Sequence, residues 1–500
     1  MNTLCKALLS SCLLAAMANG QAAVHTKVHK KAWRKPEPQV LPAVRQAVPT
    51  PVTTARGAEP KTTTRCRSEL SPEALDRVAN RSVNDDSTPV ADDRLAPVDQ
   101  LKKVAQLAIQ RSKAVGAQRW LEEAASLDLD QTKAGRYPVV SLSGSMFSGS
   151  TQVDGTTTSS GRQSTLAVSA GAPLYDGGRL SSLIEWRKDL KNAANQSMRA
   201  SQEAVVLEAV TTVLERNRYR MQAQVYQQHA RKMACLVEAL EAIVAEDPGR
   251  ASELVQVRKT QAQAEVSRDS AVAQGRQIDL KLKRLLGADF VGGGGVSVPL
   301  GATPDQGELI RLLEHSPEAL SFKAQSDAQE MYAKALNDGR MPQVNWSVSK
   351  SRSYSQPLTS SAWQAGVTVS YNLFDAGAEK AGVQAAQARA AASKEQYDDF
   401  ISTRMERISS MHDNALTAFD RAKRYVDILR DSDLVRNFTF QQWSQLGRRS
   451  LFDLMSAESD HFSLRIAYVN SLYDGYEANA QLRSMGGGLL PWIQPDGVTP

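Results

Sequence analysis

Two aspartates hold equivalent places in a short stretch that occurs twice in this chain of 500 residues. Each copy reads leucine, aromatic, aspartate, small residue, glycine, and each separates a β-type alternation from a long segment of helical composition. A carboxylate just before a helix accepts hydrogen bonds from the free N–H groups of its first turn. We therefore expect helix capping, a structural role, from both aspartates. The residues of the two junctions are Leu174, Tyr175, Asp176, Gly178, Leu373, Phe374, Asp375 and Gly377.

Residue types that serve catalysis or metal binding do not cluster elsewhere in the sequence. The six histidines are scattered: His25 and His29 have no further ligand nearby, and His412 falls in an apolar helical seam, where packing is the expected role. The four glycines of 292–295 are not followed by Lys-Ser or Lys-Thr, so they form no phosphate loop. No nucleophile elbow is present either. The sequence therefore predicts no enzyme, no cofactor, no metal and no nucleic-acid partner.

Export is predicted from the start of the chain. Residues 1–23 have the pattern of a secretory signal peptide, in which Lys6 gives the charged start and Ala7–Ala18 the apolar segment. Its removal leaves two cysteines, Cys66 and Cys235. They could pair, but two cysteines so far apart in sequence make no disulfide framework, and we expect free thiols.

Residues 24–96 form a basic extension rich in proline and threonine. Between Val24 and Arg67 it holds ten lysines and arginines against two glutamates, without apolar periodicity. Such a composition buries too little apolar surface to offset chain entropy, so disorder is predicted. A solvated tail is the expected role, and a basic tether to peptidoglycan or anionic lipid is the alternative.

A first structural repeat, residues 97–286, combines a helix, a β-hairpin and a long helix pair. Apolar residues that alternate with small or polar ones mark the hairpin. A long stretch without proline marks the first helix of the pair, which would be roughly 100 Å long. The expected elements are a helix over Pro97–Ala134, a hairpin over 139–175, and helices over Gly178–Ala245 and Ala251–Leu286.

The same order of elements returns over residues 305–488, after a glycine-rich linker at 287–304. Gly339-Arg340-Met341-Pro342 precedes the second hairpin as Gly135-Arg136-Tyr137-Pro138 precedes the first. Apolar residues then recur at spacings of four and three, which predicts a coiled coil. The expected elements are a helix over 305–338, a hairpin over 343–374, a helix over Ala378–Asp433, a break at Leu446–Ser450, a helix from Leu451 to Gly486, and a tail over 489–500.

Four membrane-type strands pose a physical problem for a single chain. Their apolar and small polar faces suit a wall between lipid and water. Four strands cannot close into a barrel, and an open edge in hydrocarbon leaves backbone groups unpaired at several kcal/mol each. The chain must therefore oligomerise to cross a membrane. Two copies give eight strands with a filled interior, and three give twelve with room for a conduit.

This combination of features resembles the TolC family of outer-membrane channel proteins, over about residues 97–488. The resemblance implies a mainly α-helical fold with a small all-β membrane part: duplicated long helices form a coiled-coil tube, and four strands per chain contribute to a homotrimeric 12-stranded β-barrel. It implies a location in the outer membrane of a Gram-negative bacterium, in contact with outer-membrane lipid and extending into the periplasm. The implied partners are a periplasmic adaptor protein and an inner-membrane ABC or proton-driven pump.

The resemblance also implies a gate at the periplasmic tip. Two aspartates three positions apart ring the closed entrance in the family, and here the first matches Asp453 while the second position is Ser456. An arginine of the family's gate network matches Arg449, but its tyrosine partner falls at Ser444. The network's aspartate position falls at Val255, with Glu253 as a nearby substitute. Ordinary first-turn helix charge is the alternative for Asp453 and Arg449. The predicted gate residues are Arg449, Asp453, Ser456 and Glu253, and the predicted adaptor-contacting tip is Gly249, Arg250, Gly447 and Arg448.

The expected cargo depends on the branch of the family to which the chain belongs. The pattern Gly249-Arg250-Ala251-Ser252-Glu253-Leu254 and the long basic extension look more like channels for type I secretion of large adhesins. Small-molecule or drug efflux is the alternative. A soluble coiled-coil interaction protein is a remote alternative, because it explains the heptads but leaves the four alternating strands and their duplication unexplained.

Overall fold

A computed structural model describes residues 95–153, 156–288, 290, 292–355, 358–444 and 448–494, all within one unit of the chain. The predicted signal peptide, Cys66 and Gly447 lie outside the described residues, as do nearly all of the predicted extension and the end of the tail. No helix in the described ranges holds a stretch long and apolar enough to cross a bilayer.

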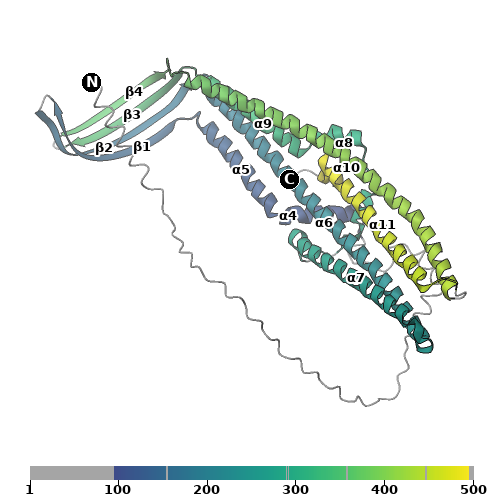
Figure 1. The fold of residues 1–500 in the computed structure, drawn as a ribbon. Coiled ribbons are helices and arrows are strands. Elements are labelled where there is room, and N and C mark those ends of the chain that lie inside the picture. Colours follow the sequence, from purple (N-terminus) through teal and green to yellow (C-terminus); the bar gives the residue numbers. More distant parts are fainter. Residues whose placement is uncertain are drawn as a thin grey trace, which may run out of the picture. The chain divides into compact units, whose positions relative to one another are not determined.

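Two similar series of elements follow each other along the chain (Figure 1). The first consists of α4 (Pro97–Arg111), α5 (Lys113–Ala134), β1 (Val139–Val153), β2 (Thr156–Tyr175), α6 (Arg179–Glu246), the 3₁₀ turn η2 (Pro248–Arg250) and α7 (Ala251–Leu286). The second consists of η3 (Gly294–Gly301), α8 (Gln306–Leu313), α9 (Pro317–Asp338), β3 (Gln343–Ser355), β4 (Leu358–Ser370), α10 (Ala378–Ser444), α11 (Leu451–Met485) and α12 (Leu489–Ile493). The mainly helical fold with four antiparallel strands is confirmed.

In each series two α-helices precede the hairpin where the sequence predicted one, over 97–134 and 305–338. Ser112 separates α4 from α5, and its Oγ accepts a hydrogen bond from the Val115 N–H at 3.2 Å. Ser316 does the same between α8 and α9, accepting from the Ala319 N–H at 3.3 Å. A serine hydroxyl competes with the helical backbone for its N–H groups and so favours the start of a new helix.

The four strands form one antiparallel sheet in the order β1-β2-β3-β4. Their register gives the sheet two unlike faces. The apolar face carries Val140, Leu142, Met146, Leu166, Val168, Trp346, Val348, Trp363, Val367 and Val369. The polar face carries Ser141, Ser143, Ser145, Thr165, Ser169, Ser347, Ser349, Ser351, Ser353, Gln364 and Thr368. Hydroxyls pair across the strands of the polar face, with Ser141 Oγ 2.7 Å from Ser169 Oγ.

The second hairpin ends earlier than its sequence pattern predicts. The alternation continues to Leu373, but β4 ends at Ser370 and leaves residues 371–374 outside the sheet. Ser370 pairs with Gln343, which is the first residue of β3, the partner of β4 within the chain. A strand ends where its partner no longer offers hydrogen bonds, whatever its side-chain pattern.

The helices pack around α6, which contacts α5, α7, α9 and α11. The main core joins α4, α6 and α7 with η3 and the C-terminal helices, and Leu101, Leu214 and Leu286 are almost fully buried in it. Glu203 of α6 accepts hydrogen bonds from the N–H groups of Leu489 and Leu490, which fastens the short α12 to this core.

The heptad seam of α10 is only half buried within the chain. Ile408, Ala415 and Ala422, seven residues apart, are at most 4 % exposed, and the first two pack against α8 and α11. Met405 and Val426, from the alternate seam positions, are 36 % and 47 % exposed. When neighbouring helices of the same chain cover only part of an apolar stripe, the rest of the stripe can contact another chain.

Candidate functional site

The two junction aspartates adopt the same capping geometry. At the first junction, Asp176 accepts hydrogen bonds from the N–H groups of Gly178 at 3.0 Å and Leu180 at 2.6 Å. At the second, Asp375 accepts from Gly377 at 2.9 Å and Glu379 at 2.6 Å. These backbone hydrogen bonds, from Glu379 first, lower the pKa of Asp375. Each carboxylate thus serves the first turn of its long helix, α6 or α10.

The turn after each aspartate needs left-handed backbone. Gly177 and Gly178 have φ of 68° and 91°, and Ala376 and Gly377 have 56° and 88°. A Cβ on Gly177 would lie 2.4 Å from the Cβ of Met341, so only glycine fits the first turn. The second turn tolerates Ala376 despite its left-handed strain.

The apolar junction residues lie on the surface of the chain. Leu174 and Tyr175 are 60 % and 55 % exposed, while Leu373 and Phe374 are 90 % and 88 % exposed. Tyr175 pairs with Val344, which places it at the end of the sheet that joins the helices. Exposed aromatic residues at the end of membrane strands are typical of the interface with lipid head groups.

The first helix tip is the turn between α6 and α7. Asp247 accepts a hydrogen bond from the Gly249 N–H at 3.1 Å and shapes the turn. Arg250, predicted to contact an adaptor, donates two hydrogen bonds to Glu253, a predicted gate residue, at 2.7 and 3.1 Å. Glu253 is therefore engaged by its own neighbour in the first turn of α7.

The second helix tip lies between α10 and α11. Ser450 and Asp453 form a reciprocal capping box: the Asp453 N–H donates to Ser450 Oγ at 3.2 Å, and the Ser450 N–H donates to Asp453 Oδ2 at 3.1 Å. The Nε–H group of Arg449 donates a hydrogen bond to Gln442 Oε1 at 3.1 Å. Arg449 and Ser456 are both exposed.

Asp453 thus caps its own helix, as the alternative to gating expects, and its role in a gate stays a prediction. The predicted gate residues are not joined to one another within the chain. Among the described residues, no hydrogen bond or ion pair connects Glu253 with Arg449 or Asp453. Arg448, of the predicted tip, is exposed, and its N–H donates to the Gln442 carbonyl.

One apolar cluster fastens the two tips to each other. It combines Met233, Leu236 and Leu240 of α6 and Val257 of α7 with Leu451, Leu454 and Met455 of α11, and Phe440 and Trp443 of α10 pack against it. Leu240, Val257 and Leu454 are completely buried. The tips of both repeats therefore form a single packed end within one chain.

A buried ionic cluster, which was not predicted from the sequence, lies near these tips. Glu458 of α11 is 1 % exposed, with Lys232 Nζ of α6 at 3.8 Å and Arg436 of α10 at 3.6 Å. Arg436 also pairs with Asp433. Desolvation raises the pKa of Glu458, and the two cations oppose that rise. One signal was available: Glu458 continues the apolar spacing of Leu451, Leu454 and Met455, where a charge must be buried.

Two histidines, His229 and His461, lie on helices α6 and α11, which also carry Lys232 and Glu458. Burial lowers the pKa of His461 to about 3 and that of His229 to about 4, so both are neutral at physiological pH. His229 stacks on Phe462, with ring centroids 4.6 Å apart, and His461 Nδ1 lies 3.3 Å from Ser432 Oγ. These contacts indicate packing.

The described ranges contain no metal site, and their single cysteine is oxidised. In the described ranges no group of three or more His, Cys, Asp or Glu side chains could hold a metal ion. Cys235 of α6 is disulfide-bonded, which makes the expectation of a free thiol wrong. An exported chain meets oxidising conditions, which favour a disulfide over a free thiol.

A match to a known protein family identifies the family of this chain. The family described as "Outer membrane efflux protein" matches residues 104–288 and 309–488, which are the two repeats. The chain belongs to the outer membrane efflux protein family. Its predicted resemblance to TolC-family channels and its predicted outer-membrane location are thereby confirmed, and the family is one of channel proteins rather than enzymes.

Solved structures of other outer membrane proteins and channels show the same fold. CusC is 18 % identical, with a TM-score of 0.68 over 78 % of this chain and 92 % of its own. The outer membrane protein VceC of Vibrio cholerae is 15 % identical, with a TM-score of 0.68 over 78 % and 97 %. The CmeC outer membrane channel of Campylobacter jejuni is 14 % identical, with a TM-score of 0.68 over 88 % and 94 %. The comparison with curated proteins gives no match.

Proposed function

We propose that this outer membrane efflux protein is the exit duct of a tripartite export system, fed by an inner-membrane pump through a periplasmic adaptor. The carrying observation is the sheet: it has one apolar and one polar face, and each outermost strand has one edge unpaired within the described part of the chain. In hydrocarbon those edges must find partners. Other copies of the same chain supply them.

Three copies suit a conduit. They place twelve strands in one barrel, with the apolar faces toward lipid and the serine-rich faces toward the lumen. Each copy continues directly into α6 and α10, each roughly 100 Å long at 1.5 Å per residue. The half-exposed heptad seam of α10 supplies the surface on which neighbouring helices would pack into a tube.

The helix tips are the proposed gate and adaptor contact. Arg448, Arg449 and Ser456 are all exposed at or near the second helix tip, between α10 and α11. Because Glu253 and Asp453 already bind within their own first turns, contacts that close the entrance must come from neighbouring copies. Reversing the charge of Arg449 is expected to raise the open-state conductance of the oligomer, whereas the capping variant Asp453→Ala is expected mainly to destabilise α11.

Membrane extraction followed by conductance measurement tests the duct. The full chain should leave membranes only with detergent and run as an oligomer that dissociates on heating. In a planar lipid bilayer the purified oligomer should conduct ions. A monomer that is soluble without detergent would leave the duct without a basis and favour the coiled-coil interaction protein. An intact oligomer that never conducts would rule out a conduit while leaving the fold untouched.

Type I protein secretion is the cargo class that we propose. It is supported by the Gly249–Leu254 pattern at the first tip and by the long basic extension. Small-molecule efflux is the second candidate, and the description of the matching family as efflux proteins favours it. The ion pair between Arg250 and Glu253 gives part of that pattern a local structural reason, which lowers its value as a mark of one branch.

Deleting the gene separates the two cargo classes. Loss of a large secreted protein from the culture medium, with unchanged sensitivity to toxic small molecules, supports protein secretion. The reverse result supports efflux of small molecules. Complementation with the intact chain serves as the control for both readouts.

A further inference from the structure

All charged side chains of the four strands lie on one face and have one sign. They are Arg162 of β2 and Lys350 and Arg352 of β3, and the strand sequences contain no aspartate or glutamate. The register places Arg352 beside Leu166, and Lys350 between Val168 and Trp363. All three cations therefore share the apolar face with the large hydrophobic side chains.

Within the described residues, these cations have no protein partner to neutralise them. No ion pair or hydrogen bond joins any of the three to another residue in the described part of the chain, and all three are exposed. On the lipid-facing side of a barrel an unpaired cation is strongly unfavourable at the bilayer midplane and tolerated near the interfaces. The three cations must therefore lie near an interface.

Strand geometry identifies which interface this is. From Val344, which pairs with Tyr175 at the helix end of the sheet, to Arg352 is about 26 Å along β3 at 3.3 Å per residue. A strand tilt of about 40° reduces this to roughly 20 Å across the membrane, close to the height of the apolar band. Arg352 thus lies at the end of the band away from the periplasmic helices, where the outer leaflet has its head groups.

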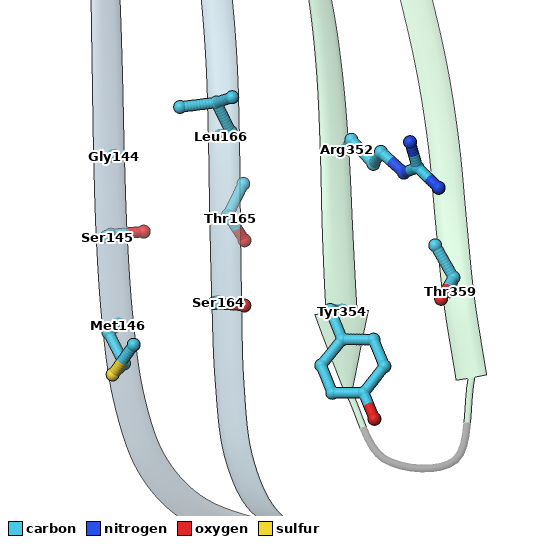
Figure 2. A pocket seen from close by; sticks show the side chains of 9 residues that line it. All are labelled: Gly144, Ser145, Met146, Ser164, Thr165, Leu166, Arg352, Tyr354 and Thr359. Atoms are coloured by element: carbon cyan, nitrogen blue, oxygen red, sulfur yellow. The ribbon is translucent and has the colours of Figure 1, made fainter.

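The surface around Arg352 is shaped for an amphipathic molecule. Two adjoining grooves, of about 520 and 710 Å³, share Leu166, Arg352 and Thr359 along their walls. Figure 2 shows the Arg352 side chain extending from β3 toward β4, with Leu166 on the neighbouring strand β2. The second groove continues past Val168 and Val348, which offer an apolar path for a hydrocarbon chain.

We propose that Arg352, Lys350 and Arg162 bind the phosphate groups of an outer-leaflet glycolipid, lipid A, whose acyl chains lie along the apolar face below them. Guanidinium and ammonium groups match phosphate in charge and hydrogen bonding. The absence of acidic residues from all four strands gives this surface a single electrostatic preference. The inference rests on the proposed barrel, because it needs the apolar face to be the lipid-facing one.

Reconstitution with defined lipids tests this surface. The full-length oligomer is placed in phospholipid vesicles that contain either bis-phosphorylated or phosphate-free lipid A, and the lipid A that remains bound after detergent extraction is measured. We expect preferential retention of the phosphorylated form. Each basic residue near a membrane surface contributes roughly a fivefold change in affinity, so Arg352→Gln and Lys350→Gln should each lower retention by about that factor.

Control variants keep the outcome unambiguous. Arg352→Lys retains the charge and should retain most of the binding, and Lys423→Gln removes an exposed charge of α10 and should change nothing. Equal retention of both forms of lipid A, or unchanged retention in Arg352→Gln, would overturn the inference. Displacement by inorganic phosphate alone would also overturn it, because it would show a free-anion site. Heat-modifiable migration and conductance, measured on the same samples, report separately whether the duct itself has formed.

Discussion

Replacing Glu458 by glutamine removes the carboxylate that two buried cations share between three helices. Lys232 is 13 % and Arg436 9 % exposed, so both ammonium and guanidinium lose an ionised partner inside the protein. Breaking a buried ion pair from one side costs about 3 to 5 kcal/mol. We expect the lower end of this range, about 3 kcal/mol. The two contacts of Glu458 are long, at 3.8 and 3.6 Å, and Arg436 keeps Asp433 as a partner.

Chemical denaturation of the detergent-solubilised protein, followed by far-UV circular dichroism, measures this loss. Glu241→Gln is the matched control, because Glu241 also pairs with an arginine between two helices, Arg258, but is 48 % exposed. That exposed pair is worth about 0.5 kcal/mol. Equal stability losses for the two variants would refute the reasoning that burial sets the size of the effect.

A further variant separates charge from packing. Replacing Lys232, Arg436 and Glu458 together by methionine removes the desolvation cost along with the attraction, and such apolar replacements are often neutral or stabilising. We expect the triple variant to be more stable than Glu458→Gln. A triple variant that is less stable would show that the ion pairs themselves hold the three helices together.

Three other outcomes follow from the structure. Burial raises the pKa of Glu203 from 4.5 to about 7, so stability should fall by about 3 kcal/mol as pH rises from 4.5 to 7, and Glu203→Gln should remove that slope in denaturation series. Ala376→Gly should raise the melting temperature by relieving a left-handed alanine worth about 1 kcal/mol, whereas Gly177→Ala should lower it through its clash with Met341. Cys235 should resist maleimide labelling under denaturing conditions until a reductant is added.

Short-range patterns in the sequence were sufficient to predict the strands and the strand-to-helix junctions. Alternation along residues 139–175 reflects the pleat itself, and the capping by Asp176 and Asp375 involves residues no more than four positions away. The break between α8 and α9 was also local, since Ser316 precedes Pro317, a common first helical residue. The residues on both sides of Ser316 have helical composition, so the break was not predicted.

Features that depend on partners distant in the chain could not be predicted. The early end of β4 is set by Gln343, and the ionic cluster joins Lys232, Arg436 and Glu458 from three helices. A sequence shows that Glu458 occupies an apolar position but not which cations reach it. The gate was predicted from resemblance alone, and Asp453 illustrates the difficulty, because the same residue in the same first turn serves a capping box.

The shared apolar cluster limits how the helix tips of one chain can move. Separating α11 from α6 would expose Leu451, Leu454 and Met455 to water, at about 5 kcal/mol for the three side chains together. It would also break the contact between Glu458 and Lys232. The tips bind each other through this cluster, whereas the charged residues Arg448 and Arg449 are exposed. The least costly opening motion therefore keeps the two tips of each chain together and separates the chains from one another.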